Sequence, residues 1–288
     1  MQLFLEQLLN GLAIGAIYAM ITLGLALVYG ILRILHVAHA AVYTLGAYVG
    51  LTIFSATGSL TLAVLGSMAF CAALGVVIER FVYYPLLKYP PYVPLIGSIA
   101  CLLAIEEICR LVWGPEIQSF PATLSFPSFK VGGILVSSTL SAVYAISAGV
   151  LLLLWFITTK TELGLAMRAT SQDRAIASSM GINSHWIISV TFMIGSAVAA
   201  IAGILVGIYY NQVYPSMGAV PAYKTLALIV VGGLGSVPGA VLASVLLGVA
   251  ETLLIGYAGI PLPRDALAFI AMIAVLLWRP QGLLGGRR

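Results

Sequence analysis

The sequence predicts an all-α protein that crosses a membrane several times. Hydrophobic residues make up 61% of the chain, charged residues make up 8%, and the mean hydropathy is +1.11. A soluble domain usually has about 25% charged residues, so this chain has too few charges to cover a water-exposed surface. Its continuous apolar runs suit helices of ~20 residues rather than the ~10-residue alternating strands of a membrane β-barrel. We therefore expect a polytopic helical bundle with about eight or nine segments, some of them broken or half-length.

The apolar runs follow one another without room for a second folded domain, so residues 1–288 are expected to form one transmembrane domain. The run 223–234 is too short to cross a bilayer and ends in Gly232, Gly233 and Gly235, which predicts a half-helix or a strongly bent segment. The run 38–56 is barely long enough. The runs are 6–32, 38–56, 59–78, 94–113, 134–157, 186–210, 223–234, 239–257 and 265–278.

Basic residues predict the orientation, because they are enriched in cytoplasmic loops. If the connection 158–185 is cytoplasmic, alternation places Arg33, Arg80, Lys88, Lys160, Arg168, Arg174, Arg279, Arg287 and Arg288 on that side. It places Lys130, Lys224 and Arg264 outside, with Arg110 near the outer end of its span. We therefore expect an external N-terminus and a cytoplasmic C-terminus. The external segment 114–133 is expected to be an ordered loop with short strands, either a docking surface or a connector.

The connection 158–185 is a polar insertion between two apolar runs. Thr170 and Asp173 are spaced like the start of a capping box, and Gly181 suits the left-handed residue that ends a helix. The short helix between them would carry a small apolar face, made of Ala175, Ile176, Ser179 and Met180. Such a helix suits a groove on another protein. Binding to lipid headgroups is the less favoured alternative, because only two cations would face the lipid.

One acidic residue, Glu251, lies well inside an apolar run with no cation three or four residues away. A carboxylate inside a membrane is costly, so it marks either a pathway or proton relay, or a structural acceptor. We favour a structural acceptor for hydroxyl or backbone groups of a neighbouring helix, because a single carboxylate makes a poor relay. By contrast, Glu106 and Glu107 can pair with Arg110 along one helix face.

The sequence shows no catalytic constellation and no metal-ligand spacing. His36 and His39 are more readily explained as interfacial or hydrogen-bonded structural residues than as metal ligands. The cysteines, Cys71, Cys101 and Cys109, are expected to be small core residues. The run Gly232–Gly239 lacks the lysine of a nucleotide-binding loop, so no cofactor is expected on this chain. The formal charge of +4 is small and does not indicate nucleic-acid binding.

Four stretches resemble the permeases of branched-chain amino acid ABC importers, and they occur in that family's order. The first is the polar loop, with Glu162-Leu-Gly164, Met167-Arg168-Ala169, Asp173, Ala177 and Gly181-Ile182-Asn183. The others are Gly24–Gly50, Gly232–Gly239 and the C-terminal Arg279-Pro280-Gln281-Gly282-Leu283-Leu284-Gly285. The chain is most similar to the shorter of the family's two permease subunits. It departs from the family's usual N-x-A-H-G pattern at His36 and Ala40, which leaves open whether the substrate is a branched-chain amino acid, urea, an amide or an aromatic acid.

The resemblance implies a multi-pass permease of a bacterial-type inner membrane, in contact with lipid, that forms half of a substrate pathway. A second and longer permease, two cytoplasmic ATPases that hold ATP, and a periplasmic binding protein would complete the importer. A rigid helix over 166–181 would couple the permease to the ATPases. The implied coupling residues are Glu162, Gly164, Arg168, Ala169, Asp173, Ala175, Ile176, Met180 and Gly181. Candidates for the pathway or its helix breaks are His36, His39, Tyr43, Gly232, Gly233, Gly235 and Glu251.

The main alternative is an autonomous secondary transporter or channel that works without ATPases. Such proteins also use broken helices, and they usually depend on intramembrane carboxylates, so Glu251 and the glycine break are compatible with this class. The capped polar loop 158–185 has no role in it. The importer permease is therefore the favoured prediction.

Overall fold

The structure, a computed structural model, describes residues 2–122, 126–131, 133–261 and 263–285. The first half of the chain forms α1 (Gln2–Leu32), α2 (His39–Thr57), α3 (Leu60–Ile78), the π-helix η1 (Glu79–Tyr83), α4 (Tyr84–Leu86), α5 (Tyr92–Trp113) and the strands β1 (Phe129–Val131) and β2 (Ile134–Val136). The second half forms α6 (Ser138–Lys160), α7 (Glu162–Gln172), α8 (Arg174–Ser179), α9 (Ser184–Tyr210), the 3₁₀-helix η2 (Pro215–Gly218), α10 (Ala219–Gly232), α11 (Val237–Glu251), the π-helix η3 (Thr252–Tyr257) and α12 (Arg264–Trp278).

The prediction of a polytopic helical membrane protein is confirmed. Within the described residues, 6 helical runs are long and apolar enough to cross a bilayer: 2–32, 39–57, 60–86, 138–160, 184–210 and 237–257. Helices α5, α10 and α12 match the remaining expected runs. Helix α10 has 14 residues, about 21 Å at 1.5 Å per residue, which is too short for the ~30 Å hydrocarbon core. The expected half-length segment is therefore present.

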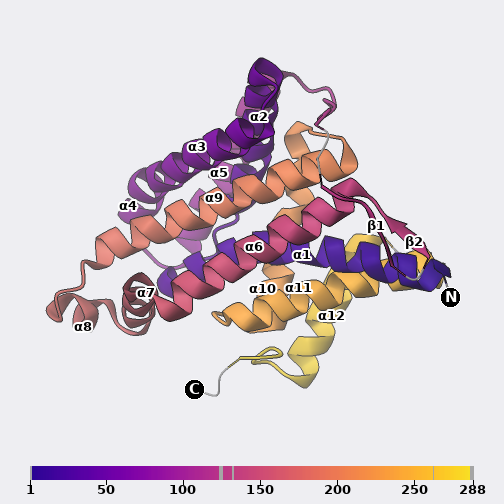
Figure 1. The fold of residues 1–288 in the computed structure, drawn as a ribbon. Helices are drawn as coiled ribbons and strands as arrows, with labels where there is room; N and C mark the ends of the chain where they lie inside the picture. The colour runs from indigo at the N-terminus through magenta and orange to yellow at the C-terminus, as the bar shows by residue number, and fades with distance from the viewer. Residues whose placement is uncertain (1, 123–125, 132, 262, 286–288) are drawn as a thin grey trace.

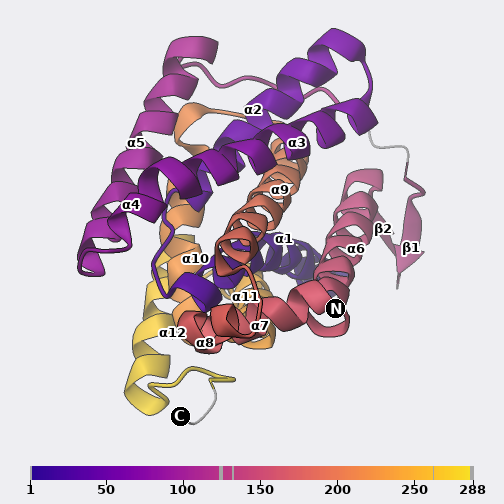
Figure 2. The same ribbon diagram turned by 90° about the vertical axis from the view of Figure 1, so that its left-hand side faces the viewer.

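Helices α1 and α9 form the centre of the bundle. The most apolar window of α1 is 83% buried and that of α9 is 72% buried, whereas that of α3 and its extension is 28% buried. Viewed from the α7–α8 end, α2–α5 lie on one side of this central pair, and α10–α12 lie on another (Figure 2). The N-terminus and the β1–β2 hairpin lie at the opposite end from α7 and α8 (Figure 1).

Residues 114–122 pack on the end of α9, and the β1–β2 hairpin follows further along the chain. Gln118 pairs with Val213 in an isolated antiparallel bridge, and Phe129 and Lys130 of β1 face Val136 and Leu135 of β2. The expected loop with short strands is therefore observed, although part of the expected region, residues 123–125 and 132, lies outside the described residues.

The structure corrects the placement of one basic residue used for the orientation. Lys224 was expected in an external position, but it lies inside the bundle on α10 with 2% of its side chain exposed. The run that contains it begins earlier than expected, at Ala219, which draws Lys224 into the helix. Arg287 and Arg288, used in the same argument, lie outside the described residues.

The glycine break joins α10 to α11 and is covered by the C-terminal tail, residues 279–285. Helix α10 ends at Gly232, and Gly233 has a φ of +106° that favours glycine. A Cβ on Gly232 would lie 2.4 Å from the carbonyl carbon of Gly239, so the two helix ends meet backbone to backbone. The N–H groups of Leu283 and Leu284 donate to the carbonyls of Val231 and Gly232, at 2.8 and 3.1 Å. The tail therefore satisfies carbonyl groups at the end of α10.

We expect Gly282→Ala to lower the midpoint of thermal unfolding more than Gly259→Ala does. Both glycines have left-handed backbones, with φ of +80° and +66°, so each substitution costs about 1–2 kcal/mol of conformational strain. Only at Gly282 would the new Cβ meet other atoms, because Gly233 Cα would lie 2.4 Å away. This clash adds about 1–3 kcal/mol. Equal shifts for the two purified variants in detergent would contradict the proposed packing of the tail.

Candidate functional site

The polar loop folds into two short helices at one end of the bundle. The Thr161 hydroxyl accepts the Gly164 N–H at 3.2 Å and caps α7. A Cβ on Gly164 would lie 2.4 Å from the carbonyl oxygens of Ile157 and Thr158, so this position suits glycine where α7 folds back on α6. The guanidinium of Arg168 donates to the Thr158 carbonyl at the same junction. Gly164 and Arg168, expected in a coupling element, thus fix α7 against α6.

The expected continuous helix over 166–181 is wrong, because the chain breaks at Asp173. This residue has an extended backbone, and its Oδ1 accepts the N–H groups of Ala175 and Ile176 at 2.8 and 2.9 Å. Asp173 is therefore the N-cap of α8, while Thr170 lies buried within α7 instead of starting a capping box. The expected end is correct: Gly181 follows α8 with a φ of +88°.

Helix α8 presents an exposed apolar surface at this end of the bundle. We name it the α8 surface, and it consists of Ala175, Ile176 and Met180. Ile176 is 60% exposed and Met180 is 79% exposed, whereas Ala177 on the other side of the helix is buried. Glu162 and Asp173 are also exposed, and Ala169 is half-buried. Exposed apolar side chains beside charged groups are typical of a protein interaction site.

Arg174, expected from sequence to be a cytoplasmic basic residue, ties α8 to the central helix. Its Nη2 donates to the carbonyls of Ile31 and Leu32 at 3.3 and 3.4 Å, at the C-terminal end of α1. Burial lowers the pKa of Arg174 below its usual value, and the nearby Arg33 lowers it further. A cation at the C-terminal end of a helix is favourable. The sequence signal for this contact would have been a basic residue directly after the α8 cap.

The polar loop and the glycine break line a common cavity. A cavity of about 320 Å³ lies between them. Gly164, Met167 and Arg168 line it from the loop, and Gly235 and Ser236 line it from the turn between α10 and α11. Of the three glycines at the break, Gly232 and Gly233 make close backbone contacts and Gly235 faces this cavity. They therefore lie near the loop helices.

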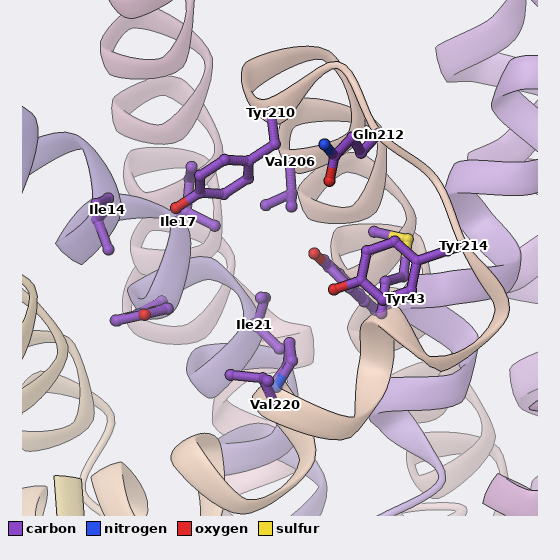
Figure 3. Close-up of a pocket in the computed structure, with 12 residues that line it drawn as sticks. Ile14, Ile17, Ile21, Tyr43, Val206, Tyr210, Gln212, Tyr214 and Val220 are labelled. Carbon is purple, nitrogen blue, oxygen red and sulfur yellow. The ribbon is translucent and has the colours of Figure 1, made fainter. Parts of the chain in front are cut away.

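A separate cavity of about 240 Å³, which we name the outer cavity, opens near the other end of the bundle (Figure 3). Tyr210, Gln212 and Tyr214 line its mouth from the exit of α9, and Tyr18 reaches it from near the midpoint of α1. Tyr43, a candidate from sequence, also lines it. Its aliphatic and other apolar lining consists of Ile14, Ile17, Ile21, Val206, Met217, Val220 and Pro221. The cavity thus combines an apolar wall with tyrosine hydroxyls.

A buried ion cluster lies directly behind Tyr18. The ammonium of Lys224 contacts Glu251 at 2.8 Å and Asp265 at 3.1 Å, and it donates to the Tyr18 hydroxyl at 2.9 Å. The Tyr18 hydroxyl donates in turn to Glu251 at 3.1 Å. Glu251 is 1% exposed and Asp265 is 41% exposed. The expected hydroxyl partner of Glu251 is present, but its cation was missed because Lys224 is 27 residues away and comes close only through the packing of α10 on α11.

The two histidines lie outside the lining of this cavity, where α1 turns into α2. The Nδ1 of His36 is 2.5 Å from the Tyr83 hydroxyl, which donates to Ser98 at 2.7 Å. His39 begins α2, and a Cβ on Gly24 would lie 2.7 Å from its ring. Both histidines are buried in the bundle. The interpretation of His36 as a hydrogen-bonded structural residue agrees with this geometry.

The functional residues expected from sequence therefore lie in three separate places. The loop residues and the glycine break lie at the α7–α8 end, the histidines lie at the α1–α2 turn, and Tyr43 and Glu251 lie in and behind the cavity. The cysteines are free, with Cys71 and Cys109 buried and Cys101 half-buried. The groups that sequence reasoning missed are Tyr18, Lys224 and Asp265.

Comparison with known proteins gives concordant matches. Residues 7–276 match the family model described as the branched-chain amino acid transport system permease component. The chain is 34% identical to the high-affinity branched-chain amino acid transport system permease protein BraD of Pseudomonas aeruginosa, over 98% of this chain and 96% of the relative. It is 32% identical to the corresponding permease protein LivH of Escherichia coli K12, with the same coverage. It is also 30% identical to LivM of Escherichia coli K12, over 43% of this chain and 29% of that relative.

The fold is also similar to that of a solved structure. PsaBC from Streptococcus pneumoniae in complex with Fab aligns over 96% of this chain and 90% of that chain, with a TM-score of 0.52 and 14% identity. At this identity the match supports the arrangement of helices alone.

Proposed function

Because this chain belongs to the family of permease components of branched-chain amino acid transport systems, we propose that it forms half of the pathway of an ATP-driven importer. The substrate would be a branched-chain amino acid or a related small polar or amphipathic molecule. A periplasmic binding protein would deliver it, and a second, longer permease would complete the pathway. ATP would be hydrolysed on two separate cytoplasmic ATPase subunits rather than on this chain.

The α8 surface carries this proposal, because it offers an exposed apolar contact where a cytoplasmic partner would bind. Ile176 and Met180 are available to a groove on an ATPase, and Glu162 and Asp173 lie exposed nearby for polar contacts. The N-terminus and the β hairpin lie at the opposite end, and the tail lines a cavity together with Ser171 and Gln172 of α7. This arrangement supports an external N-terminus and a cytoplasmic C-terminus in a bacterial-type inner membrane.

Movement of α8 would reach the pathway through its anchors. Arg174 holds the end of α1, and the same helix carries Tyr18 in the wall of the outer cavity. Arg168 holds α7 to α6, and α7 shares a cavity with the glycine break. When the ATPases close, a displacement of α8 would therefore pull on α1, which packs against α11. Such a change of packing would interconvert inward-facing and outward-facing states.

The test is a pull-down of the tagged chain from its native membrane in mild detergent, with identification of the proteins that co-purify. We expect two ATPase subunits and a second permease, and ATP-dependent uptake after reconstitution with the binding protein. Recovery of the intact chain alone, with uptake that needs no ATP, would instead assign it as a secondary transporter. The buried Lys224–Glu251 pair is the feature that favours that alternative.

A further inference from the structure

We propose that the outer cavity and the adjoining Tyr18–Lys224–Glu251 cluster form a transit binding site for zwitterionic α-amino acids. The charged head group would lie at the cluster, and the side chain would lie against the aliphatic wall. This inference rests on the proposed importer function and adds to it the residues that bind and select the substrate inside the permease.

The cavity is suited to a molecule with an apolar side chain. Its wall is mainly aliphatic, and among the described residues that line it none is charged; the polar groups are tyrosine hydroxyls and the Gln212 amide. A few polar groups in an apolar pocket fix the orientation of a small ligand. Urea has no apolar part to place against Ile17, Ile21 and Val206, so this wall favours an amino acid with an aliphatic or aromatic side chain.

The charged cluster lies directly behind the cavity. Tyr18 belongs to both, because its side chain lines the cavity and its hydroxyl bonds to Lys224 and Glu251. Val220 and Pro221 line the cavity from the start of α10, and Lys224 follows them by four and three residues. Residues at these spacings share one helix face, so Lys224 lies one turn deeper than the cavity wall. A rotation of the Tyr18 side chain would bring the ion pair into contact with the cavity.

An α-amino acid is complementary to this pair. Its carboxylate would face the Lys224 ammonium, and its ammonium would face the Glu251 carboxylate, so that no uncompensated charge enters the bundle. Lys224 also contacts the half-exposed Asp265, and a molecule with one charge alone would add a net charge to this buried site, which is costly. The position near the midpoint of α1 agrees with transporter sites near the bilayer midplane. The cluster should therefore admit zwitterions and reject amides and simple carboxylic acids.

The first test compares single and double variants in the reconstituted complex of permeases, ATPases and binding protein. The single variant Lys224→Met leaves Glu251 buried without its cation and is expected to assemble poorly, whereas Glu251→Gln leaves Lys224 paired with the half-exposed Asp265. The double variant Lys224→Met/Glu251→Gln removes both charges and is expected to assemble. We expect it to keep ATP hydrolysis stimulated by the loaded binding protein, while L-leucine uptake falls at least about tenfold. Uptake by the double variant at the wild-type level would overturn the inference and leave the pair a structural tie between α10 and α11.

A second test needs no variant in the cluster. The wild-type permease pair with its ATPases, without the binding protein, is heated with L-leucine, leucinamide or 4-methylpentanoate, and its thermal unfolding midpoint is measured. We expect L-leucine to raise the midpoint, and the two singly charged analogues to be bound at least about tenfold more weakly. Equal effects of all three compounds would overturn the inference. A wild-type complex that takes up L-leucine without ATP would contradict the proposed importer function instead, so the two failures are distinguishable.

Discussion

Replacing both Ile176 and Met180 by aspartate is expected to abolish ATP-driven uptake while the chain remains folded in the membrane. Both side chains are exposed and apolar, so the change removes contacts to a partner without opening the core. Burying two unpaired carboxylates in an apolar groove would cost several kcal/mol, enough to release an ATPase that binds through this groove. The measurement is the amount of ATPase subunit that co-purifies with the tagged chain, together with uptake in vesicles.

The matched control for this prediction is Ile117→Asp, at the opposite end of the chain's bundle. Ile117 is 63% exposed in the connection after α5 and is as apolar as Ile176, but it lies far from the α8 surface. We expect this variant to retain its ATPase subunits. If the double α8 variant also retains them and still transports, α8 is not the coupling element. If both variants lose them, the effect is a general response to added charge.

The helices were predictable because their signal is strong and local. A membrane-spanning segment must satisfy its backbone N–H and C=O groups with its own hydrogen bonds, which requires a helix, and it must have an apolar surface. A long apolar run in the sequence therefore predicts such a helix directly. The expected run 186–210 and the observed helix Ser184–Tyr210 therefore end at the same residue and differ only at the start. The start is set by the N-cap Asn183, whose side chain accepts the Trp186 N–H. The half-helix over 223–234 could be predicted because it too is an apolar run, and because glycines mark where it ends.

The site was less predictable, because its contacts join distant parts of the sequence. Lys224 meets Glu251 and Tyr18 only after α10 packs beside α11 and α1, and no local pattern records that meeting. The break at Asp173 was missed for a different reason. Thr170 and Asp173 both favour helix starts, and the sequence does not show which of them finds free N–H groups. Arg168 and Arg174 look alike in sequence, yet one holds α6 and the other holds α1.

The anchors on either side of α8 explain why so short a helix suits a coupling role. A helix of 6 residues is not stable alone in water, so α8 depends on the Asp173 cap and on the burial of Ala177. These contacts orient Ile176 and Met180 outward, while Arg174 fixes the helix to α1. If a partner binds the exposed side chains, a force on them would therefore be carried to the central helix through Arg174.

Replacing Gly248 by valine is expected to prevent α1 from packing against α11 and to remove most of the folded protein. A Cβ on Gly248 would lie 2.4 Å from the backbone nitrogen of Gly15 and 2.5 Å from its Cα. These are backbone atoms of the most buried helix, so the clash can be relieved only by moving the two helices apart. Small residues allow such close approach between membrane helices. The added volume should therefore cost more than about 3 kcal/mol, at or beyond the upper end of ordinary overpacking.

The comparison variant is Gly149→Val in α6, which makes the same chemical change on an exposed helix face. A Cβ at Gly149 would meet no atom within 4 Å, so only its helix propensity changes, and valine is no worse than glycine there. Purified yield and the thermal unfolding midpoint should fall sharply for Gly248→Val and stay near the wild-type value for Gly149→Val. A folded Gly248→Val protein with an unchanged midpoint would show that α1 and α11 are not in backbone contact. In that case Tyr18 and Glu251, which lie on these same two helices, would not be held within hydrogen-bond distance by that packing.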